Sequence, residues 1–216
     1  MAKAGVYLHF FWGGTHLAPM HGFEKINSKE DIMHSETILQ EKDIQESIQA
    51  IVKKIIEAHK GLDDVVLVGI RTGGAYLAAR FQKAIAELTG REVPMGVLDI
   101  TLYRDDWTRI GPSPRVGKTE LPFSVDDKTV ILVDDVLFTG RTVRAAMDAL
   151  VDYGRPKKIE LAVLVDRGEE YRELPISPNY VGGVWPTRPG QTINVYLREA
   201  GFIDHVSIEE KKAAQA

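Results

Sequence analysis

The sequence predicts an α/β fold in which helices flank a central, mostly parallel sheet. Residues 65–70 and 130–133 are continuous apolar runs with the length and composition of strands that are buried on both faces. Residues 159–165 form a further strand candidate that is apolar except for Glu160. Segments with helical periodicity separate these runs, and strands that alternate with helices are typical of parallel sheets with right-handed crossovers. Ligands bind such sheets beyond the carboxyl ends of the strands, so we expect a site in the turns after the strands.

The composition is typical of a soluble globular protein. The 216 residues fit one domain of ordinary size, and 27% of them are charged and 44% hydrophobic. The chain has no cysteine, which excludes disulfides, thiolate catalysis and cysteine-ligated zinc and fits the cytoplasmic location that we expect. No apolar run approaches the roughly 18 residues of a membrane span. A formal net charge of −4 argues against sequence-independent binding of nucleic acid.

The local pattern divides the chain into an N-terminal extension, a domain and a short tail. Residues 1–32 combine glycines, a proline, aromatics and three histidines without a sustained period, so they predict an atypical extension. His16 and His21 have no framework of carboxylates or cysteines, and we assign them no metal. The domain is expected to span residues 33–208, and residues 209–216 predict a tail that is frayed, helical or disordered.

The domain is expected to begin with a helix, followed by a strand, a turn and a second helix. Apolar residues recur with helical spacing from Ile44, and this helix is expected to end near Gly61. The buried strand at 65–70 leads into a turn at 71–74, and a helical pattern then covers residues 75–88.

A further strand and a long loop follow. Residues 93–102 alternate loosely between apolar and polar, which predicts a strand. Residues 103–122 are rich in Arg, Asp, Gly and Pro and have no period, so they predict a long, flexible loop. Long loops in compact domains are often functional lids.

The second half continues the alternation of strands and helices. A helix is expected at 142–150 and a strand at 159–165. Residues 166–188 predict loops, and residues 193–197 are the last strand that the pattern predicts.

The segment VILVDDVLFTGRT, at residues 130–142, carries the clearest chemistry. A buried apolar strand brings Asp134 and Asp135 to its carboxyl end, and the chain then turns into a helix at Thr142. A helix N-terminus favours an anion, the two threonines add hydroxyl donors, and Gly140 lets the backbone approach a ligand closely. Carboxylates beside such an anion site can accept hydrogen bonds from vicinal hydroxyls, so the segment suits ribose 5-phosphate.

Other interpretations of this segment are weaker. The chain has no GxxxxGK[ST] motif, which excludes a Walker-type nucleotide site, and no GxGxxG motif for a dinucleotide. A core strand, an acidic loop start or a Thr-Gly helix cap would each be unremarkable alone. Their combination in this order favours a phosphorylated ribose.

The segment resembles the signature by which type I phosphoribosyltransferases bind phosphoribosyl pyrophosphate (PRPP). Further motifs resemble the PyrR family, the pyrimidine operon attenuation regulators with uracil phosphoribosyltransferase activity, and the resemblance covers residues 33–197. The motifs are ITLYRDD at 100–106, VRAAMDALVDYGRP at 143–156, and LAVLVDRG at 161–168 followed by RELPI at 172–176. The resemblance implies the type I phosphoribosyltransferase fold, with a small hood and a long flexible loop.

The family reaction converts uracil and PRPP into UMP and pyrophosphate, with Mg²⁺ bound mainly through PRPP. By resemblance, Asp134 and Asp135 hold the ribose hydroxyls and act with Arg104 in catalysis. The 5-phosphate is assigned to Val136, Leu137, Phe138, Thr139, Gly140, Arg141 and Thr142. The pyrophosphate is assigned to Arg71, Thr72 and Gly73.

The resemblance also assigns the lid, the nucleobase and the metal. Arg109, Arg115 and Lys118 of the flexible loop are expected to cover the pyrophosphate. The hood, from residue 165 onward, is expected to bind uracil, largely through backbone groups of Val165, Asp166 and Arg167. No direct protein ligand to Mg²⁺ is expected. The family resemblance implies a homodimer or homotetramer.

Two of the departures from the family bear most directly on the expected function. Thr72-Gly73-Gly74 stands where many members have Thr-Arg-Gly, so an arginine is missing. Either its absence weakens catalysis or Arg71 compensates for it. RGEEYRELPI stands where the RNA regulators have RGHRELPI. Residues 166–188 contain three arginines and four acids, and this net charge of −1 argues against RNA binding.

Alternatives to a uracil phosphoribosyltransferase remain open at this point. One is an RNA-binding attenuation regulator that senses UMP, which the acidic hood disfavours. Another is a phosphoribosyltransferase for a different base, such as a purine. A third is a regulator that senses nucleotide and contacts only proteins.

Overall fold

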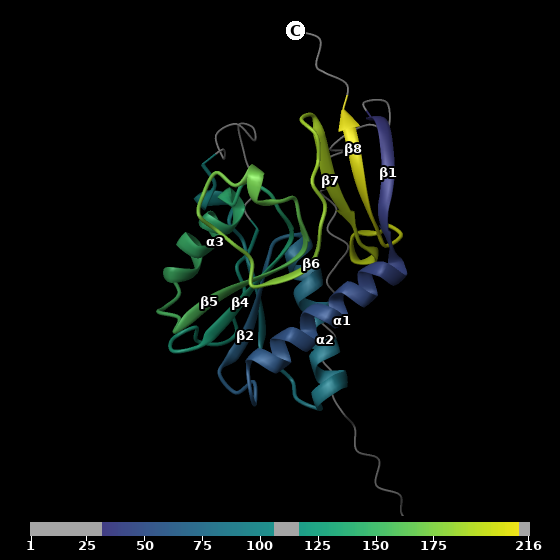
Figure 1. The fold of residues 1–216 in the computed structure, drawn as a ribbon. Coiled ribbons are helices and arrows are strands. Elements are labelled where there is room, and N and C mark those ends of the chain that lie inside the picture. Colours follow the sequence, from purple (N-terminus) through teal and green to yellow (C-terminus); the bar gives the residue numbers. More distant parts are fainter. Residues whose placement is uncertain (1–31, 106–116, 212–216) are drawn as a thin grey trace, which may run out of the picture.

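The computed structural model describes residues 32–105 and 117–211, and within these ranges five parallel strands form a central sheet (Figure 1). The sheet has the order β3-β2-β4-β5-β6. The chain runs from β2 to the edge strand β3, crosses back past β2 to β4, and continues through β5 to β6. The strands are β2 (Val65–Ile70), β3 (Met95–Leu98), β4 (Thr129–Leu137), β5 (Lys158–Asp166) and β6 (Tyr180–Val184). The α/β class and the mostly parallel sheet are confirmed.

Helices cover both faces of this sheet. In Figure 1, α1 (Glu41–Ala58) and α2 (Gly73–Thr89) lie on one side and α3 (Arg141–Val151) on the other. Strand β2 shows why both faces are buried, because all six of its residues are buried. Val65 and Leu67 pack against α1 and α2, whereas Val66, Val68 and Ile70 pack with α3.

A smaller antiparallel sheet, here called the hood sheet, stands beside the central sheet (Figure 1). In the described residues it has three strands in the order β1-β8-β7, which join the two ends of the described chain. They are β1 (Ile32–Gln40), β7 (Gln191–Tyr196) and β8 (His205–Lys211). Short 3₁₀ helices lie at Thr101–Tyr103, Glu169–Tyr171 and Arg198–Ala200.

An ionic cluster fixes the hood sheet to α2. Arg80 on α2 donates to Asp204, which precedes β8, at 2.8 Å, and to Glu199 at 2.6 Å. Arg198 also pairs with Asp204, at 3.0 Å. Burial alone would raise the pKa of Asp204, but the hydrogen bonds from Arg80 and Arg198 outweigh it and lower that pKa to about 2.

Several predicted boundaries were wrong. The strand expected at 93–102 covers only Met95–Leu98, because the Asp99 carboxylate accepts the Thr101 amide at 2.9 Å and turns the chain into a 3₁₀ helix. The strand expected at 130–133 continues to Leu137, so both aspartates of the motif lie within it. The helix expected from residue 75 begins at Gly73.

Three strands were missed, and each has polar or small residues that hide its pattern. Strand β6 lies in a segment expected to be loops, and its Gly182 has no space for a side chain because a Cβ there would lie 2.4 Å from the Leu164 carbonyl oxygen. Strand β1 was not expected at all, and β8 continues to Lys211, into the expected tail. Glu209 in β8 is buried and accepts hydrogen bonds from Asn194, Tyr196 and Ser207, each at 2.7 Å.

Residues 1–31 of the expected extension and residues 212–216 of the expected tail lie outside the described residues. None of the helices in the described part of the chain is long and apolar enough to cross a membrane.

Candidate functional site

Two adjacent carboxylates lie near the carboxyl end of β4, the middle strand of the central sheet. Asp134 is buried and Asp135 is partly buried. The amide of Asp135 donates to the Asp134 carboxylate at 3.0 Å, and the amide of Val136 donates to the Asp135 carboxylate at 2.8 Å. The backbone of the strand end therefore fixes the orientation of both side chains.

Burial has the largest effect on the pKa values of these two carboxylates. Removal from water raises the pKa of Asp134 well above its ordinary value, and the negative charge of Asp135 raises it further. The Asp135 amide and the charge of Arg104 act in the opposite direction but do not offset the burial. Burial also raises the pKa of Asp135. Such a pair is stabilised by cations or hydrogen-bond donors that approach it, which is what a ligand with hydroxyl groups supplies.

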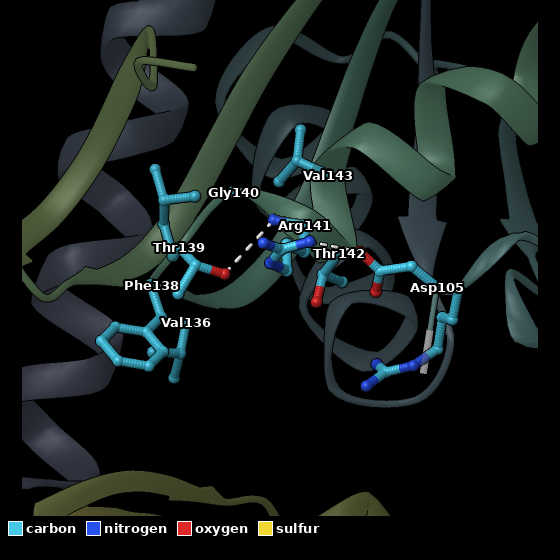
Figure 2. A pocket seen from close by; sticks show the side chains of 10 residues that line it. Asp105, Val136, Phe138, Thr139, Gly140, Arg141, Thr142 and Val143 are labelled. Atoms are coloured by element: carbon cyan, nitrogen blue, oxygen red, sulfur yellow. Dashed lines mark hydrogen bonds and ion pairs between the residues drawn. The ribbon is translucent and has the colours of Figure 1, made fainter. Parts of the chain in front are cut away.

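A cavity of about 270 Å³ lies where β4 passes into α3 (Figure 2). Its lining comprises Arg104, Asp105 and residues 136–143, which include the whole predicted anion cradle. Gly140 has a φ of 90°, a left-handed conformation that favours glycine, and α3 begins directly after it. The hydroxyls of Thr139 and Thr142 and the first amides of α3 can donate to an anion in this cavity.

Arg141 is tied by ion pairs at the rim of this cavity. Its guanidinium pairs with Asp105 and with Glu173, each at 2.5 Å, and all three side chains are about half exposed. Figure 2 shows the Arg141 side chain directed toward Asp105. Arg141 therefore links the segment after the 3₁₀ helix at 101–103 to residue 173.

A second cavity of about 380 Å³ adjoins the first, because both are lined by Arg104, Val136 and Thr142. It contains both aspartates and two cationic residues, Arg71 and Arg104. The remaining lining residues are Ile70, Thr72, Gly73, Asp99, Ile100 and Thr101. The guanidinium of Arg71 donates to the Lys118 carbonyl oxygen at 2.9 Å and lies 3.9 Å from the Asp99 carboxylate.

A third cavity of about 400 Å³ lies between the sheet edge and the hood sheet, and it adjoins the second at Thr72, Gly73, Asp135 and Val136. Its other residues are mostly apolar or aromatic. They are Tyr76, Ile193, Asn194, Val195, Tyr196, Leu197, Ala200 and Phe202. Together the three cavities form one groove along the carboxyl edge of the central sheet, with the aspartates in its middle.

Most of the predicted site residues meet in this groove. The structure brings together Asp134, Asp135, Arg104, Arg71, Thr72, Gly73 and residues 136–142. Lys118 contributes its carbonyl oxygen to Arg71, while its ammonium group pairs with Glu120 at 3.5 Å in solvent. Arg109 and Arg115 lie outside the described residues.

The residues predicted to bind the nucleobase do not line this groove. Val165 is fully buried in the core, and the Asp166 carboxylate pairs with Arg172. The guanidinium of Arg167 lies 3.6 Å from the ring centre of Phe138. Two of their backbone groups also have partners, because the Arg167 amide donates to the Leu137 carbonyl and the Asp166 carbonyl accepts from the Trp185 amide.

The side of the groove that the hood sheet forms was not identified from the sequence. Ile193, Val195 and Leu197 belong to the same packed cluster as Tyr76 and Val136. The alternation at 193–197 predicted a strand but not its partner, because β1 and β8 were not expected. The helical position of Tyr76, one turn after Thr72, was a signal that could have indicated a side chain near the turn.

A family model described as "Phosphoribosyl transferase domain" matches residues 34–181. The chain is 48% identical to "Bifunctional protein PyrR" of Syntrophobacter fumaroxidans over 182 residues, which cover 84% of this chain and 96% of that protein. It is 55% identical over 158 residues to the protein of the same name from Desulfosudis oleivorans, with 73% and 87% of the two chains covered.

Solved structures with this fold include a hypoxanthine phosphoribosyltransferase from Staphylococcus aureus. The TM-score is 0.61 at 23% identity, with 85% of this chain and 94% of that chain covered. A hypoxanthine phosphoribosyltransferase from Trypanosoma cruzi gives a TM-score of 0.60 at 22% identity, over 77% and 87% of the chains. These likenesses show the fold alone. With the family match and the relatives at about half identity, the chain belongs to the PyrR family of the type I phosphoribosyltransferase superfamily.

Proposed function

We propose that the chain is a uracil phosphoribosyltransferase, which transfers the 5-phosphoribosyl group of PRPP to N1 of uracil and releases pyrophosphate. The observation that carries the proposal is the composition of the groove, which combines an anion cradle, a carboxylate pair, a cavity with two cations and an apolar cavity. These four environments match the 5-phosphate, the ribose hydroxyls, the pyrophosphate and a planar base.

The 5-phosphate is placed in the first cavity. The threonine hydroxyls and the amides at the start of α3 donate to its oxygens, and the helix dipole favours its negative charge. Gly140 gives the phosphate close access to the backbone, which a side chain in that left-handed conformation would strain.

The ribose is placed over the aspartate pair, with its 2′- and 3′-hydroxyls donating to the carboxylates of Asp134 and Asp135. When the bond to pyrophosphate breaks, positive charge develops on the ribose, and a carboxylate pair nearby stabilises that charge. The pair is expected to act in its ionised state, which its raised pKa values oppose until a ligand supplies donors.

The pyrophosphate and the base are placed on opposite sides of C1. A displacement at C1 requires the attacking nitrogen and the departing oxygen to lie roughly in line. The second and third cavities meet beside Asp135, so C1 at this junction has one cavity on each side. The leaving group carries negative charge and suits Arg71 and Arg104, while uracil suits the floor of Ile193, Val195 and Leu197.

The reaction balances without a further co-reactant. The C1–N1 bond forms, the C1–O bond breaks with its electron pair going to pyrophosphate, and the N1 proton is released to solvent. Mg²⁺ would neutralise charge on the departing pyrophosphate. Among the described residues, no group of three His, Cys, Asp or Glu side chains gathers to hold a metal. Substrate oxygens and waters would hold the ion, as is common for Mg²⁺, and Asp134 and Asp135 keep their assignment to the ribose hydroxyls.

An RNA-binding role for residues 166–188 finds less support than the sequence alone suggested. Arg167 is buried and the Arg172 side chain is 9% exposed, so neither guanidinium is available to an RNA phosphate. The remaining charged residues of the segment are exposed. They are Glu169, Glu170, Glu173 and Arg188, with a net charge of −2 from three acids and one base.

The test is a screen of nucleobases with PRPP and Mg²⁺. We expect UMP from uracil, and rates at least 100-fold lower with hypoxanthine, guanine and adenine. Nucleotide from a purine at a rate that exceeds the uracil rate would replace the proposal by a purine phosphoribosyltransferase. If no base gives a nucleotide although PRPP and UMP bind, the chain is a nucleotide sensor.

A further inference from the structure

The segment at residues 166–176 lies directly behind the loop that we assign to the 5-phosphate. Three successive carbonyl oxygens of that loop, at residues 137, 138 and 139, accept hydrogen bonds from this segment. The donors are the Arg167 amide for Leu137 at 3.0 Å, the Arg172 guanidinium for Phe138, and the Glu173 amide for Thr139 at 3.0 Å. The loop is therefore held along its length by one neighbouring segment.

These contacts matter for anion binding because each peptide unit has a negative oxygen end and a positive amide end. Donors that bind the oxygens from behind keep the negative ends away from the cavity. They also stabilise one orientation of the loop before a ligand arrives, which lowers the cost of ordering it on binding.

Arg172 is the side chain that supplies this support at Phe138. It forms a buried ion pair with Asp166, and the two side chains are only 9% and 8% exposed. The same guanidinium donates to the carbonyls of Ile176 at 3.2 Å and Gly168 at 3.3 Å. The Asp166 carboxylate in turn accepts the Gly168 amide at 2.9 Å. A planar fork with several donors can satisfy all these acceptors at once, which a lysine ammonium cannot.

Arg167 holds the side chain of the same loop residue. Its guanidinium stacks 3.6 Å from the ring centre of Phe138 and 5.5 Å from that of Tyr171. The hydroxyl of Thr187 accepts from its Nε at 3.0 Å, which fixes the stack. Phe138 is thus held by its carbonyl through Arg172 and by its ring through Arg167.

We propose that Arg172, held by Asp166, is a positioning residue that orients the Phe138 peptide so that the loop can bind the 5-phosphate. Asp166 and Arg167 then serve the phosphate side of the reaction, not the nucleobase. The inference rests on the proposed function, because it assumes that the loop binds the phosphate of a nucleotide.

The test compares UMP with uridine, which differ only by the phosphate. The Kd of each ligand is measured, that of uridine by competition. The Kd for uridine divided by the Kd for UMP then reports the contribution of the phosphate to binding. We expect Arg172→Lys to reduce this ratio at least tenfold, through weaker UMP binding, while uridine binding stays within about twofold of wild type. Arg80→Lys is the matched control, since Arg80 also pairs with a buried carboxylate, at 2.8 Å, but does not touch the loop. It is expected to keep the wild-type ratio.

A second pair of variants covers the case in which Arg172→Lys does not fold. Glu173→Pro removes the amide that Thr139 accepts, whereas Glu173→Ala keeps it. We expect the proline variant to have the lower UMP-to-uridine preference of the two.

Each other outcome has a definite meaning. A wild-type ratio in Arg172→Lys, or equal losses for uridine and UMP, would overturn the positioning role, and equal losses would return the segment to the nucleobase. The positioning role would also be overturned if Arg80→Lys reduced the ratio of Kd values as much as Arg172→Lys does. If the wild-type protein itself shows no preference for UMP over uridine, the proposed phosphate site fails instead.

Discussion

The carboxylate of Asp135 occupies the space that a side chain on residue 73 would need. Its Oδ2 lies 2.2 Å from the position of a Cβ on Gly73. From the sequence, this glycine had indicated only a missing cation. The structure gives it a positive role, because Gly73 allows Asp135 to lie against the first turn of α2, between the second and third cavities.

Gly73→Ala is expected to lower activity without unfolding the protein. The obstructing atom is the end of a side chain, so Asp135 can move aside, and alanine favours the helix by up to about 1 kcal/mol. The displaced carboxylate should reduce kcat/KM about tenfold, which corresponds to about 1.4 kcal/mol of lost transition-state stabilisation. Steady-state kinetics and thermal unfolding measure the two effects.

Gly74→Ala provides the contrast. A Cβ there would lie 2.2 Å from the Val133 carbonyl oxygen, which is backbone of β4 and cannot rotate away. We expect a loss of about 1–3 kcal/mol in unfolding free energy, as for overpacked sites. Equal stabilities of the two variants would contradict the contrast between the movable carboxylate beside residue 73 and the fixed carbonyl beside residue 74.

Asp134→Asn should stabilise the protein, and more so at higher pH. The pKa of Asp134 is raised in the folded state, so its contribution to stability is full below the unfolded value and is lost as pH rises through the folded value. Asparagine does not titrate, so the difference in Tm between variant and wild type should grow from pH 4 to pH 8, while activity is lost. A difference that shrinks over this range would contradict the raised pKa.

Asp204→Asn should show the opposite sign. The pKa of Asp204 is lowered to about 2, so its stabilising effect is present above the unfolded value and lost as pH falls toward 2. At about 1.4 kcal/mol per pKa unit, the variant should be about 2 kcal/mol or more less stable at pH 7. Denaturant unfolding at pH 7 and at pH 3 measures the gap, which should narrow at the lower pH.

The location of the base can be tested on the hood sheet. Val195→Phe adds a ring beside the apolar floor of the third cavity, and it should raise the KM for uracil at least tenfold. Binding of ribose 5-phosphate, which uses the other end of the groove, should stay within about twofold of wild type. An unchanged KM for uracil would place the base elsewhere, for example beside Asp166.

The sequence predicted the parts of the fold whose signals are local. The strand at 65–70 is apolar throughout because both of its faces are covered, and the aspartate pair with Thr-Gly lies within one short segment. The anion cradle and the carboxylate pair were therefore identified as candidate site residues from the sequence.

The hood sheet was not predicted because its signals are distant or polar. Ile32 pairs with Lys211 from the other end of the described chain, and no local sequence pattern predicts a pairing between such distant residues. Glu209 is buried and hydrogen-bonded to neutral side chains. Because it is a charged residue, the sequence pattern predicted a tail where the structure has a strand. The residues that form the floor of the third cavity were not predicted as site residues, because they lie on or next to a strand of this sheet. The burial of Arg167 also depends on Phe138 and Thr187, two partners that its own segment does not contain.

Formation of UMP from uracil and PRPP by wild type, beside Asp135→Asn, tests the central claim most directly. The groove predicts that the wild-type protein forms UMP and pyrophosphate in equal amounts, and that the asparagine variant, which keeps the shape but not the charge, is at least 100-fold slower. No UMP from the wild type, or equal rates for the two proteins, would contradict the assignment of this groove to phosphoribosyl transfer.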